Sequence, residues 1–148
     1  MIGFKELVHT KPFAPILFIR LMVGAVFLSE GIQKFLFPEI RGAGRFASIG
    51  LPSPDFLGSF VGFFEIICGV FLLLGLLTRV SVIPLLLIMI VAIISTKLPQ
   101  VEAKGIWETL HASRTDFSML MGSLFLLAVG GGKWSIDQKL SAGDTANP

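Results

Sequence analysis

The sequence predicts an all-α membrane protein, an antiparallel bundle of four transmembrane helices with a short amphipathic helix in the first long loop. Two observations support this fold class. Of the 148 residues, 53% are hydrophobic and only 15% are charged, and the mean hydropathy is +0.83. Soluble single-core domains rarely show this balance. The apolar residues also fall into runs separated by prolines, glycines and polar loops, and about 20 such residues can cross a bilayer as a helix.

The predicted spans are bounded by residues that interrupt membrane helices. Pro38 ends the first span, Pro99 ends the third, and three consecutive glycines follow the fourth. The link Thr78-Arg79 between the second and third spans is too short for anything but a tight hairpin, so these two spans are expected to be antiparallel. The predicted spans are residues 13–37, 55–77, 80–97 and 115–129, within a transmembrane domain of residues 13–140.

The two ends of the chain are expected to lie outside the bundle. Residues 1–12 mix lysines with apolar side chains and are predicted to form an interfacial arm, while the polar tail 141–148 is predicted to be disordered. The apolar run that starts at residue 13 exceeds the ~7–15 residues of a signal-peptide core, so it is interpreted as a permanent span. Basic residues divide five against six between the two sides and do not define the orientation.

The loop between the first two spans contains the predicted amphipathic helix. Arg41 and Arg45 alternate there with Phe46, Ile49 and Leu51 around several glycines. This pattern suits a short helix that lies on the membrane surface. Two interpretations remain open: a lid over the bundle, or an ordinary surface loop anchored by Phe46.

The second span carries one carboxylate, Glu65, near its middle. At ~100° per residue, Glu65 shares a helical face with Gly58, Gly62 and Gly69, which favours close helix contact. A carboxylate in hydrocarbon costs on the order of 3 kcal/mol on insertion scales. Glu65 is therefore expected to face other protein or a water-filled cavity and to take part in function.

The first span has a similar polar face. Arg20 lies about 10 Å in from one surface and is predicted to reach Glu65 and act as its counter-ion, while Glu30 and Lys34 are spaced to pair along the helix. Asp116, at the start of the fourth span, is expected at the same end of the bundle as Glu30. The predicted ligand-binding residues are Arg20, Phe27, Glu30, Lys34, Glu65 and Asp116, with Glu65 and Glu30 as candidates for proton handling.

Simpler interpretations of the same residues also stand. The Arg20–Glu65 contact could be only a structural clamp, Lys34 could extend to the interface, and Asp116 could merely stabilise a helix N-terminus. His111 lacks converging ligands, so no metal site is predicted. The sequence shows no phosphate-binding loop, no motif for a bound cofactor and no nucleic-acid footprint, and the single cysteine, Cys68, excludes an intramolecular disulfide.

Several motifs, in this order, resemble the DoxX family of small bacterial four-helix membrane proteins. They are Arg20-Leu-Met-Val-Gly24, Glu30-Gly-Ile-Gln-Lys34-Phe35, Phe46-Ala-Ser-Ile-Gly50-Leu-Pro52, Val61-Gly-Phe-Phe-Glu65-Ile66, Leu74-Gly-Leu-Leu-Thr78-Arg79 and Trp134-Ser-Ile-Asp137. The residue before Gly31 is often His in that family and is Glu30 here. The family is related to DoxD-type subunits of a thiosulfate:quinone oxidoreductase, and its layout is similar to eukaryotic bundles that bind sterol-like ligands or assist receptor assembly.

The resemblance implies a multi-pass protein of the bacterial inner membrane with both termini cytoplasmic. Two functions remain open. In the first, the chain is a redox-associated subunit that binds a quinone or another apolar ligand in an intramembrane polar pocket and works with a redox partner subunit, since alone it is not a complete oxidoreductase. In the second, it is a non-enzymatic protein that binds lipid or assembles partners. The glycines of the second span and Gly122 also suit a homodimer contact.

Overall fold

The computed structural model describes residues 8–143, and the regular secondary structure in this part of the chain is entirely helical. The all-α prediction is thus confirmed. The helices are α2 (Ile16–Leu36), α3 (Ala43–Ser48), α4 (Pro54–Leu74), α5 (Thr78–Lys104), α6 (Ile106–Ala112), α7 (Arg114–Val129) and α8 (Ile136–Gly143). Within the described residues, three of them, α2, α4 and α5, are long and apolar enough to cross a membrane.

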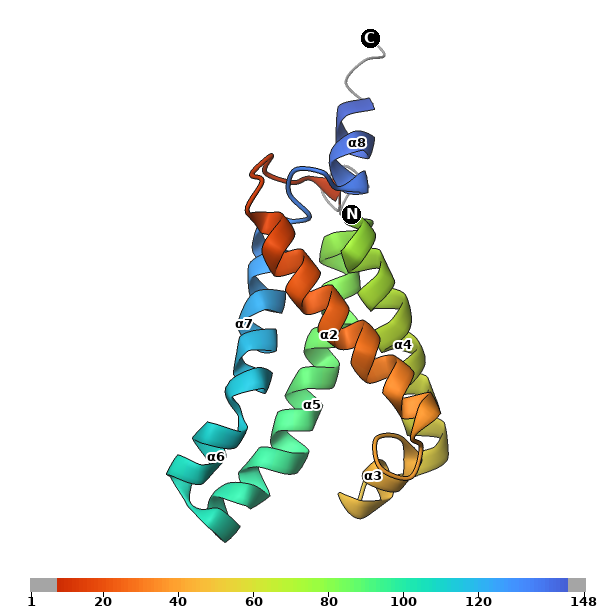
Figure 1. The fold of residues 1–148 in the computed structure, drawn as a ribbon, viewed down its shortest axis with the longest axis vertical. Coiled ribbons are helices and arrows are strands. Elements are labelled where there is room, and N and C mark those ends of the chain that lie inside the picture. Colours follow the sequence, from red (N-terminus) through yellow and green to blue (C-terminus); the bar gives the residue numbers. More distant parts are fainter. Residues whose placement is uncertain (1–7, 144–148) are drawn as a thin grey trace.

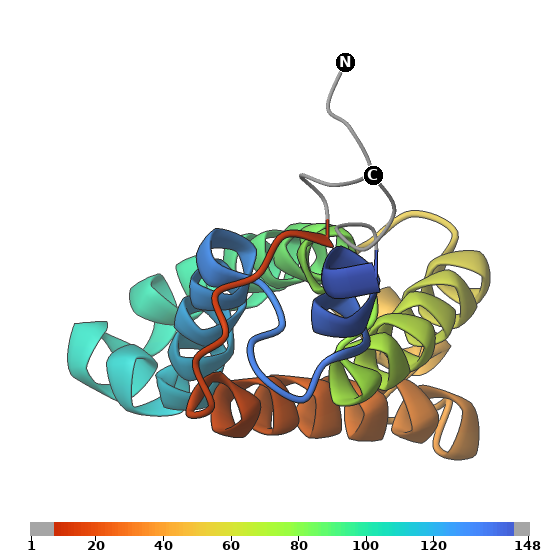
Figure 2. The ribbon, with the colours of Figure 1, turned by 90° about the horizontal axis from the view of Figure 1, so that it is seen from above.

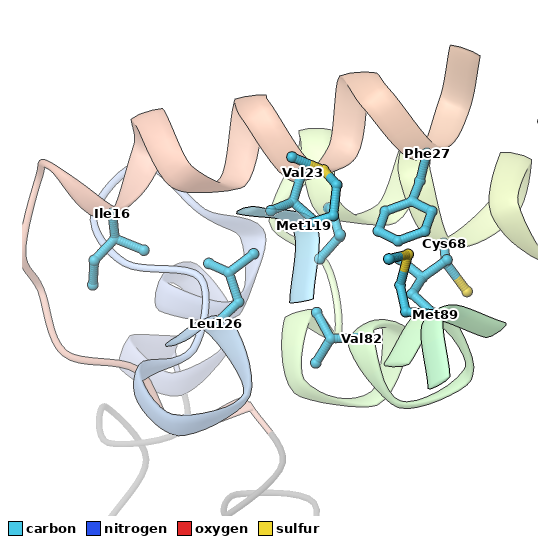
Figure 3. Close-up of a cluster of buried hydrophobic side chains, with 10 residues drawn as sticks. Ile16, Val23, Phe27, Cys68, Val82, Met89, Met119 and Leu126 are labelled. Carbon is cyan, nitrogen blue, oxygen red and sulfur yellow. The ribbon is translucent and has the colours of Figure 1, made fainter. Parts of the chain in front are cut away.

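Four helices surround a shared apolar core. Seen from above, α2, α4, α5 and α7 stand around a common centre (Figure 2). From the side, α5 and α7 diverge from α2 and α4 towards the end that carries α3 and α6 (Figure 1). Each of the four helices contributes buried side chains to the core, among them Val23, Phe27, Cys68, Val82, Met119 and Leu126 (Figure 3). The molecule is therefore closed at the α8 end and splayed at the other.

Glycines allow α2 and α4 to pack closely. A Cβ added to Gly31 would lie 2.7 Å from the carbonyl oxygen of Gly62, and one added to Gly69 would lie 2.8 Å from the backbone nitrogen of Leu28. Gly122 of α7 faces side chains of α2: a Cβ added there would lie 2.7 Å from Cγ2 of Val23. These glycines serve packing inside one chain, so they supply no argument for the homodimer, which stays a prediction.

Replacing Gly31 with alanine should therefore force α2 and α4 apart. The added methyl group meets backbone on α4, which cannot rotate away, and overpacking of this kind costs about 1–3 kcal/mol. Thermal unfolding in detergent should show a lower midpoint for Gly31→Ala. Ala25→Val enlarges an exposed position of the same helix and should leave the midpoint unchanged. Equal midpoints for the two variants would contradict this account of the glycine contact.

The turn between α4 and α5 is short, as predicted, but it lies earlier in the chain. Thr78 already belongs to α5, so the link consists of residues 75–77 and the second helix ends earlier than predicted. Gly75 and Leu77 adopt left-handed backbone conformations, with φ of 67° and 46°. The carboxylate of Asp137 accepts hydrogen bonds from the backbone N–H groups of Leu77 and Thr78, at 2.7 and 2.9 Å. A residue distant in sequence thus caps α5 and fixes the turn.

The prediction that Pro99 ends the third helix is wrong, because α5 continues to Lys104. A proline inside a helix removes one backbone hydrogen bond, and neighbouring helices can compensate for this loss. Here Lys97 holds the last turns of α5 against the following segment: its Nζ lies 3.0 Å from an oxygen of Asp116 and donates to the carbonyl of Ala112 at 3.1 Å. The helix ends instead at Gly105, where φ is 81°.

Parts of both ends of the chain pack against the protein or form a helix where the structure describes them. Residues 1–7 of the predicted arm and 144–148 of the predicted tail lie outside the described residues. Val8 is buried, and Thr10 accepts a hydrogen bond from the backbone N–H of Gly132 at 2.6 Å, so this part of the arm packs against the protein. Helix α8 continues to Gly143, beyond the predicted start of disorder at residue 141.

Candidate functional site

A cavity lies in the splayed half of the molecule, between the α2/α4 pair and the α5/α7 pair. Its volume is about 800 Å³, within the range of small-molecule sites in proteins. Most of the lining is apolar. The apolar side chains come from all four long helices and include Phe27, Phe60, Leu87, Met89, Val91 and Met119. The predicted amphipathic helix is present as α3, and its Arg45 and Phe46 line the cavity at the end near the loops.

An ion pair lies in the wall formed by α2 and α4. Lys34 Nζ is 2.6 Å from Oε2 of Glu65, and the two side chains are only 10% and 5% exposed. Lys34 is near the end of α2, whereas Glu65 is at the middle of α4, so the lysine reaches inward along the cavity wall. Two opposite charges held this close and away from bulk solvent form a polar spot in an otherwise apolar wall.

Two further acids line the same cavity. Glu30 lies on α2 near Glu65, and in the described part of the chain its carboxylate is in no ion pair. Asp116, on the opposite wall, pairs with Lys97. This second ion pair is more exposed, with side chains 20% and 29% accessible. Each pair of helices therefore carries one ion pair on its cavity face.

The predicted pairing of Arg20 with Glu65 is wrong. Arg20 is 2% exposed and lies at the closed end, where its Nη1 donates to the carbonyl of Gly131 at 2.7 Å and its Nη2 to that of Trp134 at 3.1 Å. Glu65 packs against Gly31, eleven residues and about 16 Å of helix from Arg20. Lys34 occupies the place expected for Arg20, and it pairs with Glu65 rather than with Glu30.

The structure gathers five of the six predicted ligand-binding residues around one cavity. These are Phe27, Glu30, Lys34, Glu65 and Asp116, whereas Arg20 does not line it. The sequence analysis did not predict that Lys97 lines the cavity and pairs with Asp116. Its position at the polar end of an apolar run was the feature that could have indicated it. The capping role of Asp137 was not predicted either, although that residue belongs to a motif that the resemblance singled out.

Comparisons with known proteins agree with the resemblance. The model of the DoxX family matches residues 16–98, which include the helices that carry Lys34 and Glu65. The chain is also similar to a protein of Mycobacterium tuberculosis that is described as an uncharacterized membrane protein. The two are 49% identical over 150 residues, covering 97% of this chain and 92% of the relative. No solved structure matches the chain. On these grounds, the chain belongs to the DoxX family of membrane proteins.

Proposed function

We propose that this protein is a redox-associated subunit of the bacterial inner membrane that binds a quinone-like apolar ligand in its cavity. The observation that carries the proposal is the buried Lys34–Glu65 ion pair in the wall of an apolar cavity of about 800 Å³. Ligand sites typically combine a mostly apolar lining with a few polar groups that fix the orientation of the ligand. A quinone matches that combination, because it has a flat apolar ring with two carbonyl oxygens.

The charged groups suit the proton chemistry of a quinone. Reduction to the quinol adds two electrons and two protons, one proton on each carbonyl oxygen. The ammonium group of Lys34 is a hydrogen-bond donor to such an oxygen, and the carboxylates of Glu65 and Glu30 are candidates to hold the protons that the reduction consumes. The electrons come, in this proposal, from a partner subunit of the same membrane complex. The chain would then form the quinone site of a larger oxidoreductase.

The proposal also includes a fourth membrane span and the side of the membrane on which the termini lie. Helix α7 is a fourth, short membrane span: its 16 residues extend about 24 Å, and Met119, Gly122 and Leu126 bury one face against the other spans. A span of this length is accommodated by local thinning of the bilayer. With four antiparallel spans, both termini lie on one side of the membrane, which the family resemblance suggests is cytoplasmic.

Glu65→Gln tests the proposed site. The substitution keeps the shape of the side chain but removes its charge and its ion pair with Lys34. A charge-assisted hydrogen bond between Glu65 and the bound quinol contributes, in this proposal, about 1.5–3 kcal/mol, so its loss lowers the affinity roughly 10- to 100-fold. The amount of quinone that copurifies with the protein, measured by extraction and mass analysis, should fall accordingly. Thermal unfolding in detergent should show that the variant remains folded.

Glu102→Gln is the matched control, because Glu102 is an exposed acid at the end of α5 and does not line the cavity. It should retain quinone as the wild type does. Wild-type quinone levels in a folded Glu65→Gln variant would contradict the proposal. If the wild-type protein carries phospholipid and no quinone, the redox role is replaced by the alternative, a lipid-binding or partner-assembly protein.

A further inference from the structure

The cavity wall is incomplete between α4 and α5. Phe60 on α4 and Leu87 and Val91 on α5 line the cavity, yet their side chains are 47%, 60% and 51% exposed. A residue that borders a cavity and is also half exposed marks the edge of an opening. We call the gap that these three residues border, between α4 and α5, the lateral opening.

The positions of these residues along α4 and α5 place the lateral opening at a depth similar to that of the Lys34–Glu65 ion pair. The chain turns back between α4 and α5 (Figure 1), so residues equally far from the turn lie at similar depth. Glu65 is nine residues before Leu74, the end of α4, and Leu87 is nine residues after Thr78, the start of α5. At 1.5 Å per residue both lie about 13 Å from the turn. Phe60 and Val91 lie one to two turns further, both about 20 Å from it.

This depth corresponds to the hydrocarbon core of the membrane. Both flanking helices are candidate spans. Leu87 and Val91 lie in the middle third of α5, and Phe60 lies about a third of the way along α4. The end of the cavity near the loops is different, because Arg41 and Arg45 line it, and neither arginine is in an ion pair within the part of the chain that the structure describes. The cavity thus has a basic end towards the interface and an apolar side towards lipid.

We infer that the site takes lipid-soluble quinones with long tails, whose head lies beside Lys34 and Glu65 while the tail leaves through the lateral opening into the bilayer. This inference rests on the proposed function and adds the route of entry and the class of ligand. A polyisoprenoid tail too large to coil inside about 800 Å³ has to leave the cavity, and only an apolar opening lets it do so without crossing charged groups.

The test narrows the opening and compares two probes with the same head. Menaquinone carries a long polyisoprenoid tail on its naphthoquinone ring, and menadione is that ring without the tail. Dissociation constants are measured for the protein in nanodiscs and corrected for partition into empty nanodiscs. We expect Val91→Trp combined with Leu87→Trp to weaken menaquinone binding at least tenfold more than it weakens menadione binding. Menadione binding also shows that the site is intact.

Ile90→Trp is the matched control, since Ile90 is 46% exposed on the same helix but does not line the cavity. It should change neither dissociation constant. Unchanged menaquinone binding in the double variant, or an equal loss for both probes, would overturn the lateral route while leaving the quinone site in place. Failure of both probes to bind the wild-type protein would instead refute the proposed function, and the lateral route with it.

Discussion

Arg20→Met is expected to lower the free energy of unfolding by about 3–6 kcal/mol, because it removes two hydrogen bonds from a charged donor, each contributing about 1.5–3 kcal/mol. The guanidinium group donates to the carbonyls of Gly131 and Trp134, and Arg20 is only 2% exposed. Thermal or denaturant unfolding in detergent measures the loss. Arg20→Lys should recover only part of it, because an ammonium group cannot donate in the forked geometry of arginine.

Arg79→Met provides the comparison. Arg79 also donates to a carbonyl near the end of α7, that of Ala128 at 2.9 Å, but this hydrogen bond is exposed. Exposed interactions of this kind contribute about 0–1 kcal/mol. If the two methionine variants lose equal stability, Arg20 does not have the structural role assigned to it here.

The role of Arg20 explains how the cavity is kept in shape. Its guanidinium fixes the turn after α7, in which Trp134 adopts an unusual φ of 60°. A few residues later, Asp137 caps α5 and supplies a negative charge near Arg20. The segment from Gly131 to Asp137 therefore joins α2, the end of α7 and the start of α5 at the closed end. With that end fixed, the helices can splay at the other end and border the cavity.

The helices of this protein could be predicted from hydropathy and helix-breaking residues, but some of their ends could not. Glycines and Pro38 correctly indicated where two helices stop. Pro99 did not, because α5 continues through it to Lys104, and whether a helix tolerates a proline depends on its tertiary surroundings and not on the local sequence alone. The cap that Asp137 forms on α5 joins residues about 60 positions apart, and no local pattern predicts such a contact.

The residues of the candidate site could be predicted better than their partners. An acid on a glycine face had to point inward, and Glu65 does. Its counter-ion depended on the register between α2 and α4, because Arg20 and Lys34 lie on the same face of α2, four turns apart. The contact of Gly31 with Glu65 settles the register in favour of Lys34. Distances along one helix cannot supply this information, since they say nothing of how a neighbouring helix is shifted.

Lys34→Met is expected to destabilise the protein by about 3–5 kcal/mol, because it leaves the carboxylate of Glu65 buried at mid-membrane without its counter-ion. Glu65→Met should cost less, since Lys34 lies near the end of α2 and its long side chain can turn towards the interface. Unfolding in detergent compares the two. Lys97→Met is the control: it breaks the more exposed pair with Asp116 and should cost about 1 kcal/mol or less.

The double variant Lys34→Met/Glu65→Met separates stability from ligand binding. Replacing both members of a buried ion pair by apolar side chains of similar size is often neutral or stabilising, so most of the stability lost in Lys34→Met should return. Quinone retention should not return, because the double variant lacks the polar groups proposed to hold the quinone head. A double variant that is stable and still retains quinone would show that the ion pair only clamps α2 to α4. A stable double variant without quinone would assign the charges of Lys34 and Glu65 to the ligand, since stability alone does not require them.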